Sequence, residues 1–140
     1  MSKLFTLREV VGQAQIEVGI AQVPPDAVVG SRDQDIAQMY SLLSAVADEV
    51  LLEEPYKTTL GDGVWCASAA GIPRPLGPTA DSDVILFDGR LAVTGLKYRF
   101  RSAKGLEFAE DLRDFNTRLS KAAVPDSRIL DLDADAERQI

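Results

Sequence analysis

DSDVILFDGRLAVTGLKYRFRSAKGLEFAEDLRDFNTRLSKA, residues 81–122, is the stretch of sequence that decides the fold. Its apolar residues recur at helical spacing in two runs, which predicts two helices joined at Gly105. Glycine readily takes the left-handed conformation that ends many helices, so Gly105 should end the first. Cations gather near the end of the first run, and the second run begins with acids and ends with bases, as helix dipoles favour. The core positions would be Leu91, Leu96, Phe100, Phe108, Leu112, Phe115, Leu119 and Ala122.

Two capping boxes predict two further helices upstream. Thr6 and Glu9 form the first box, and Phe5 and Val10 occupy the positions of a hydrophobic staple around it. The second box, Ser31-Arg32-Asp33-Gln34, precedes apolar residues at helical spacing up to about Glu54, where Pro55 should stop the helix. The chain therefore predicts a mainly α fold, a small antiparallel bundle of about four helices.

Two segments fall outside this helical pattern. Residues 56–80 are rich in glycine and proline, which predicts an irregular loop excursion, with a short hairpin around Leu60–Ala67. Pro125 breaks the last helix, so residues 124–140 should leave the bundle as an extended C-terminal arm. We expect one helical domain over residues 1–123, followed by this arm.

Composition limits the possible functions. The chain has 140 residues, 46% hydrophobic residues and a formal net charge of −7, which fits one globular domain and disfavours a general nucleic-acid binder. It contains no histidine and one cysteine, Cys66, so an intrachain disulfide or a cysteine-based zinc site is impossible. No apolar run is long enough for a membrane span, and the N-terminal residues show no signal-peptide pattern. These features predict a protein made in a reducing cytoplasm.

No catalytic or metal-binding constellation is evident. Asp81, Asp83 and Asp88 could supply oxygen ligands to a hard cation, but we expect Asp81 or Asp83 to cap the following helix instead. Ser68 has no histidine partner, and Cys66 is expected to be a plain small side chain. We therefore predict no enzyme activity, no metal and no cofactor, and a nuclease or peptidase subunit is disfavoured.

A cationic stripe lies on one face of the first hairpin helix. Arg90, Lys97, Arg101 and Lys104 follow one another at helical spacing, so their side chains share that face. One interpretation is contact with an acidic face of a neighbouring copy. The other is a solvated face whose charge is balanced within the chain by Glu107 and Asp111.

The loop excursion and the arm supply further candidate contacts. Tyr56 and Trp65 are either residues that cover the core or aromatic contacts to a partner. Ile129, Leu130 and Leu132 alternate with polar residues, which suits an arm that orders on a partner, or else they belong to a disordered end.

The run DSDVILFDGRLAVTGLKYRFRSAKGLEFAED, residues 81–111, resembles the C-terminal helical pair of head-to-tail connector (adaptor) proteins of tailed bacteriophages and gene transfer agents. That pattern has an acidic turn, a helix of the form LL-D-RL-V-GL-W/Y-R-F, and AKG-L-YAE at the start of the next helix. The matching residues are Asp81-Ser82-Asp83, Leu86, Asp88, Arg90-Leu91, Gly95-Leu96, Tyr98-Arg99-Phe100, Ala103-Lys104-Gly105 and Phe108-Ala109-Glu110. The chain departs from many relatives by carrying only a short segment where they have a longer β-rich insertion before this hairpin.

The resemblance implies a structural virion protein. Copies would form a ring, commonly of twelve-fold order, beneath the portal protein, join the capsid to the tail or stopper proteins, and extend a channel through which DNA passes without being gripped. It also implies that the arm docks on the portal through Ile129, Leu130 and Leu132. The alternative is a small helical protein-binding or scaffolding module that forms no ring.

Overall fold

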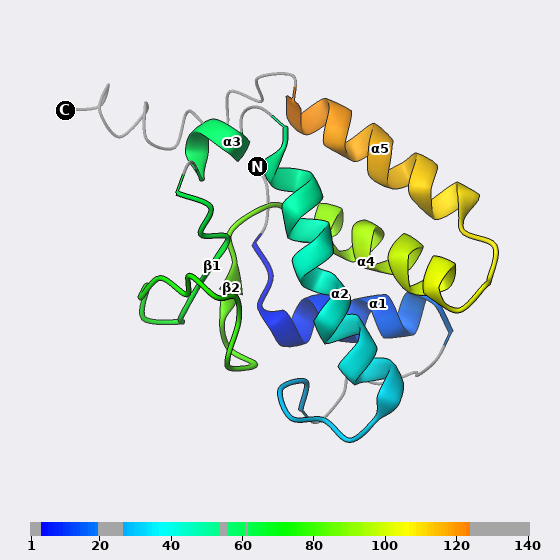
Figure 1. The fold of residues 1–140 in the computed structure, drawn as a ribbon, viewed down its shortest axis with the longest axis horizontal. Coiled ribbons are helices and arrows are strands. Elements are labelled where there is room, and N and C mark those ends of the chain that lie inside the picture. The colour runs from blue at the N-terminus through cyan, green and yellow to red at the C-terminus, as the bar shows by residue number, and fades with distance from the viewer. Residues whose placement is uncertain (1–3, 20–26, 54–55, 61, 124–140) are drawn as a thin grey trace.

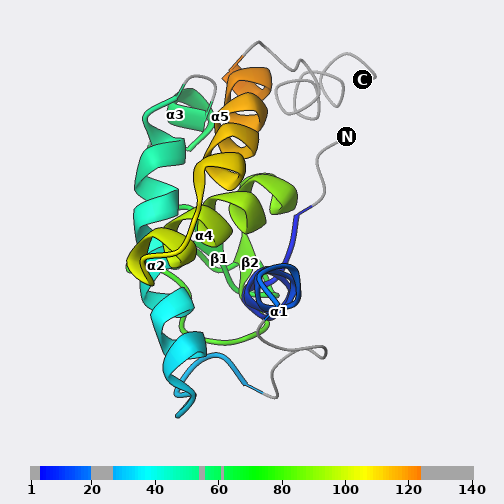
Figure 2. The same ribbon diagram turned by 90° about the vertical axis from the view of Figure 1, so that its right-hand side faces the viewer.

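Helix α4 (Gly89–Ala103) lies at the centre of the fold, in contact with three other long helices (Figures 1 and 2). The computed structural model describes residues 4–19, 27–53, 56–60 and 62–123. Around α4 pack α1 (Leu7–Glu17), α2 (Gln34–Leu51) and α5 (Ala109–Ala123), and the short α3 (Tyr56–Thr59) follows α2. The prediction of a mainly α fold is confirmed. The arm, residues 124–140, lies outside the described residues.

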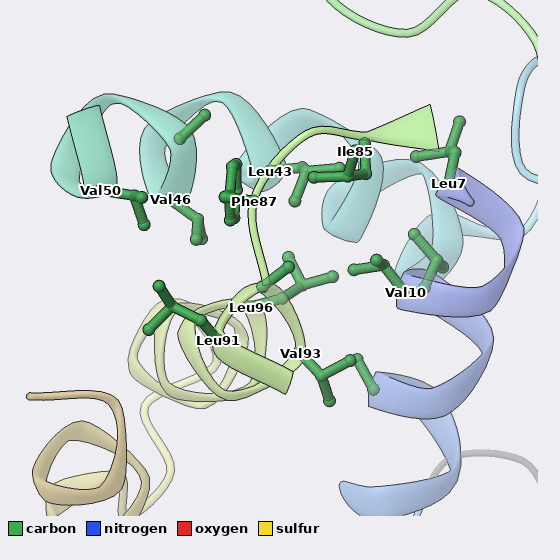
Figure 3. Packing of buried hydrophobic residues seen from close by; sticks show 14 of the residues in the cluster. Leu7, Val10, Leu43, Val46, Val50, Ile85, Phe87, Leu91, Val93 and Leu96 are labelled. Atoms are coloured by element: carbon green, nitrogen blue, oxygen red, sulfur yellow. The ribbon is translucent and has the colours of Figure 1, made fainter. Parts of the chain in front are cut away.

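Buried side chains on several sides of α4 explain its central place. Leu91, Val93 and Leu96 point from α4 into the cluster shared with α1 and α2 (Figure 3). On the α5 side, Phe115 is fully buried. A helix whose buried side chains face in several directions must be covered by several neighbours, whereas a single apolar stripe needs only one.

Gly95 lets two helices approach α4 closely. A Cβ atom at this position would lie 2.6 Å from Val46 of α2 and 2.8 Å from the Phe115 ring of α5. Both distances are shorter than van der Waals contact, so α2 and α5 occupy the space that any larger residue would need. The glycine therefore serves packing, although glycine weakens a helix in isolation.

The carboxylates of the acidic turn, residues 81–83, bind backbone amides and cap no helix. The Asp81 carboxylate accepts hydrogen bonds from the amides of Val28 and Val29, at 2.8 and 3.0 Å. The buried Asp83 carboxylate accepts from the amides of Thr79 and Ala80, at 2.8 and 3.0 Å.

The backbone of the same turn holds the start of α1. The carbonyls of Asp83 and Asp81 accept from Leu7 and Arg8, at 2.8 and 3.2 Å. The expectation that Asp81 or Asp83 caps the following helix is therefore wrong: Asp88 is the N-cap of α4, and it accepts from the Leu91 amide at 3.0 Å. Asp81 is occupied by amides of a distant segment, which the local sequence does not reveal, whereas Asp83 accepts from amides three and four residues before it.

Two short strands close the fold beside α1. β1 (Cys66–Ala67) pairs antiparallel with β2 (Val84–Ile85), with Cys66 opposite Ile85. The predicted hairpin around residues 60–67 is therefore wrong, because the partner strand lies after the loop. Strands of two residues show no alternation in the sequence, and their pairing is set by the surrounding packing.

Some of the helix ends predicted from the sequence are confirmed, and one differs. The box of Thr6 and Glu9 is confirmed by its two reciprocal hydrogen bonds, and Gly105 has the expected left-handed backbone, with φ of +73°. α2 is capped by Asp33 instead of Ser31, whose hydroxyl accepts from the Asp33 amide at 3.2 Å. The aspartate carboxylate reaches two first-turn amides, so it displaces the serine two residues earlier as the cap.

Gly95→Ala should destabilise the protein by about 1–3 kcal/mol, because its methyl group would overlap Val46 and Phe115. This effect opposes the gain in helix propensity, which is about 1 kcal/mol. Urea unfolding followed by circular dichroism measures the change. Ser102→Ala, at an exposed position of the same helix, is the matched control and should stay within about 0.5 kcal/mol. A Gly95→Ala protein more stable than the parent would contradict the close packing.

Candidate functional site

The cationic stripe of α4 meets the last residue of α1. The Arg90 guanidinium donates two hydrogen bonds to the Glu17 carboxylate, at 2.5 and 3.1 Å. Lys97 donates to the same carboxylate at 2.9 Å, and Arg101 donates to the Glu17 backbone carbonyl at 3.3 Å. A single glutamate thus fixes the end of α1 against α4.

The remaining stripe contacts reach α5 and α2. Arg101 and Lys97 pair with Asp111 of α5, at 3.1 and 3.4 Å. Lys104 pairs with Asp35 in the first turn of α2, at 3.0 Å. Asp111 is 13% exposed, so solvent screens its pairs less than it would screen a pair on the open surface.

All four stripe residues therefore carry intrachain ion pairs, and contact with a neighbouring copy stays a prediction. The interpretation that charge is balanced within the chain named Asp111, which does pair with the stripe. It also named Glu107, whose carboxylate instead accepts from the Ala109 amide at the start of α5, at 3.0 Å. Glu17 and Asp35 are the other acids that pair with the stripe cations. They lie far from the stripe in sequence, so the charge pattern could not reveal them.

These bonds lower the pKa of Glu17 from 4.5 to about 2. The hydrogen bond from Arg90 is the largest cause; burial opposes it, and bonds from Gln13 and Lys97 add to it. The same pair raises the pKa of Arg90. Glu17 is therefore ionised across the neutral and mildly acidic range, and the cluster acts as a fixed clamp between helices.

A second polar cluster joins α2 to α4. The Tyr98 hydroxyl donates to Glu49 at 2.5 Å, and Arg99 donates to the same carboxylate oxygen. Burial and the hydrogen bond to Glu49 raise the pKa of Tyr98 to about 12. Tyr98 and Arg99 belong to the run that resembles connector proteins, and here both connect α4 to α2.

The structure places Tyr56 and Trp65 in the core. Their side chains are 1% and 7% exposed, and each packs against Phe87, with ring centroids 6.3 and 6.4 Å away. This is the core-covering position that the sequence left open. Contact of these two side chains with a neighbouring copy or a tail protein remains a prediction. Neither ring is exposed in this structure.

A different part of the excursion is exposed, and sequence reasoning missed it. Residues 68–77, called the apolar loop below, carry Ile72 and Leu76 at 59% and 98% exposure. The Ser68 amide donates to the Ile72 carbonyl at 2.7 Å, and the Arg74 amide donates to the Cys66 carbonyl at 2.8 Å. Prolines and glycines predicted a loop here, but no periodicity indicated which apolar side chains face outward.

The apolar loop is fastened to the core by an ion pair. Arg74, its one charged residue, pairs with the buried Asp83 carboxylate at 3.3 Å. At its far end, a Cβ atom on Gly77 would lie 3.3 Å from the Trp65 ring, so the backbone packs directly on that ring. The loop is therefore an ordered projection, with its apolar tips in solvent.

The described residues hold no cluster of metal-ligating side chains. No group of three or more cysteine, aspartate or glutamate residues among them is placed to bind a metal ion. Burial raises the pKa of the Cys66 thiol to about 11, so it stays protonated at neutral pH. None of the helices in this part of the chain has the length and apolar character to cross a bilayer. The arm residues Ile129, Leu130 and Leu132 lie outside the described part.

Glu17→Gln should destabilise the protein by about 1–3 kcal/mol at pH 7, because it removes the charge that Arg90 and Lys97 share. The lowered pKa means that Glu17 contributes this stability fully above pH 4.5 and loses it as pH falls to about 2. Urea unfolding at a series of pH values should show the difference from the parent shrinking over that window.

Asp48→Asn, an exposed acid in the last turn of α2, is the control and should stay within about 0.5 kcal/mol of the parent at pH 7. A difference between Glu17→Gln and the parent that stays constant from pH 7 to pH 2 would show that the charge of Glu17 does not hold the helices.

Comparisons with protein-family models, with curated proteins and with solved structures found no match to this chain. The contacts of the described residues, and the resemblance of residues 81–111 to connector proteins, are what bears on function.

Proposed function

We propose that this protein is a structural component of a phage-like virion, a connector whose copies form a ring beneath the portal and join the capsid to the tail. The resemblance of residues 81–111 supplies the family and its expected twelve-fold order. The virion head–tail interface would be its location, with the portal and a tail or stopper protein as partners.

The apolar loop is the observation that carries the proposal. It presents Ile72 and Leu76 to solvent from a backbone that is already ordered by hydrogen bonds and by the Arg74–Asp83 pair. An ordered apolar projection loses little conformational entropy on binding, which is typical of a protein–protein contact.

The charges support the same function. The four stripe cations pair with acids of their own chain, and the chain as a whole carries a net charge of −7. Tight binding to DNA needs unpaired cations directed at phosphates. A ring of such chains would give a neutral or repulsive wall, past which DNA could move without being gripped.

A helical protein-binding module without a ring is the second candidate. The intrachain pairing of Arg90, Lys97, Arg101 and Lys104 favours it, because those residues would otherwise have been the contact between copies. The two candidates differ in whether copies touch one another. That difference can be measured directly.

Full-length protein, added to purified heads that carry a portal but lack this protein, should bind as a ring at the portal vertex and restore tail joining. Isolated protein should be monomeric or weakly associated, because non-obligate interfaces are about as polar as ordinary surface. Electron microscopy of the heads and native mass spectrometry of the free protein measure these outcomes. Heads that bind single copies would favour the module, and heads that bind none would refute the connector.

Deleting residues 126–140 should leave a folded helical protein that no longer joins these heads. The arm's three large apolar residues could each contribute about 1.5–3 kcal/mol when buried on a partner. Repetition around a ring would multiply that attachment. If the truncated protein completes heads as well as the full chain does, the arm has no docking role.

A further inference from the structure

The outer face of α5 carries an open hollow. α5 lies at one edge of the bundle and packs on α4 through the buried Phe115 (Figure 1). On its other side, residues at helical spacing from Ala109 to Lys121 line a hollow of about 640 Å³. Ligand pockets hold drug-sized molecules in roughly 300–1,000 Å³, so this hollow has room for several side chains.

The hollow combines a mostly apolar wall with positive charge. Leu112, predicted as a core residue, is only partly buried and is one of the lining residues. Arg113 and Lys121 also line the hollow, and none of the described residues that line it is acidic. No ion pair joins either cation to another residue in the described part of the chain, whereas the stripe cations of α4 all have such pairs. A segment that carries both apolar side chains and carboxylates would therefore match this hollow.

The C-terminal arm has this combination of residues. Residues 124–140 contain five acids and two bases, a net charge of −3. The large apolar residues Ile129, Leu130 and Leu132 stand among these acids. Opposite charge and apolar character thus favour the arm as the occupant of the hollow.

The arm begins where the hollow ends. Lys121 lies two residues before the end of α5, and Pro125 disfavours continuation of the helix. Leu112 lies eleven residues before Ala123, which is ~16 Å along the helix axis. Leu130 lies seven residues after Ala123, and an extended chain of that length spans ~23 Å. The apolar residues of the arm can therefore come back along α5 as far as Leu112 of their own chain.

We propose that in the free protein the arm folds back into the α5 hollow of its own chain. Ile129, Leu130 and Leu132 pack on the apolar wall, and aspartates of the arm pair with Arg113 and Lys121. A tethered segment has a high effective concentration at a site on its own chain, so the arm occupies the hollow ahead of a separate protein.

The contact needs no partner, so it does not depend on the proposed connector function. Where that function holds, the same apolar side chains serve both the hollow and the portal, and they cannot occupy both at once. The arm would then be stored on α5 until the portal displaces it.

Spin labelling of the arm tests this contact in the free, full-length protein. A nitroxide on Ala134→Cys broadens the NMR signals of nearby amides, and the parent treated with the same reagent gives the background, since its Cys66 is fully buried. The proposal places Leu130 and Leu132 beside Leu112, so the label should lie just beyond them. The amides of residues 109–113 should therefore broaden most, and those around Asp48 of α2 should stay sharp.

An arm that stays in solvent would give a different pattern. Its label would broaden most strongly the amides nearest its attachment, around Ala123, and that result would overturn the proposal. A mixture of spin-labelled chains without isotope and isotope-enriched chains without the label detects contact between copies. Broadening of residues 109–113 in this mixture would mean that the arm reaches another copy, which would also overturn the contact within one chain.

Paired charge reversals test whether the hollow holds the arm. Arg113→Glu with Lys121→Glu should remove the broadening of residues 109–113. Arg32→Glu with Lys57→Glu, at exposed positions outside α5, changes the net charge equally and should leave the broadening in place. Circular dichroism should show the same helix content in both proteins. Broadening that survives the first pair, or that both pairs remove, would overturn the role of the hollow.

Electron microscopy of portal-bearing heads with the same protein separates this inference from the proposed function. Rings on heads, formed by a protein whose free arm stays in solvent, would refute the stored arm while the connector function stands. A docked arm in a protein that never binds heads would support the contact with α5 and refute the connector.

Discussion

Packing of α1, α2 and α5 around α4 is the constraint on which the rest of the structure depends. Gly95 permits it, because α2 and α5 both occupy the space beside that residue. Burying side chains such as Leu91 and Leu96 contributes about 1.5–3 kcal/mol each, whereas an exposed ion pair contributes about 0–1 kcal/mol. Burial therefore supplies most of the stability. The ion pairs around Glu17 and Asp111 fix how the helices are set against one another.

The local parts of this fold could be predicted from the sequence. Helical periodicity predicted the long helices, the capping-box pattern predicted the start of α1, and Gly105 predicted the end of α4. Each of these signals depends on residues within a few positions of one another. The start of α2 was predicted two residues early, because Ser31 and Asp33 could both act as the cap.

The candidate contact surfaces depended on residues far apart in the chain, so the sequence could not assign them. Glu17 forms ion pairs with Arg90 and Lys97 of α4, and Asp83 forms an ion pair with Arg74 of the loop. No spacing rule predicts which acid meets which base across the fold. The exposure of Leu76 is likewise a result of where Arg74 and Gly77 hold the backbone, and composition alone cannot show it.

Ion pairs within the chain engage the four stripe cations, and the apolar loop keeps its large apolar tips in solvent. Assembly through the apolar loop would then depend little on salt, since screening weakens exposed charge pairs and leaves apolar burial intact. The acidic exterior would keep free copies apart until a partner raises their local concentration. This combination suits a protein that must remain separate before assembly and hold firmly afterwards.

A structure of the assembled protein on portal-bearing heads, at a resolution that shows side chains, tests the account most directly. The account predicts a closed ring in which the apolar loop, residues 68–77, is buried against another chain. It also predicts that Arg90 and Lys97 remain on Glu17 of their own chain. A ring whose interface is built from Arg90, Lys97 and Arg101 reaching acids of a neighbouring copy, with Leu76 still in solvent, would contradict it.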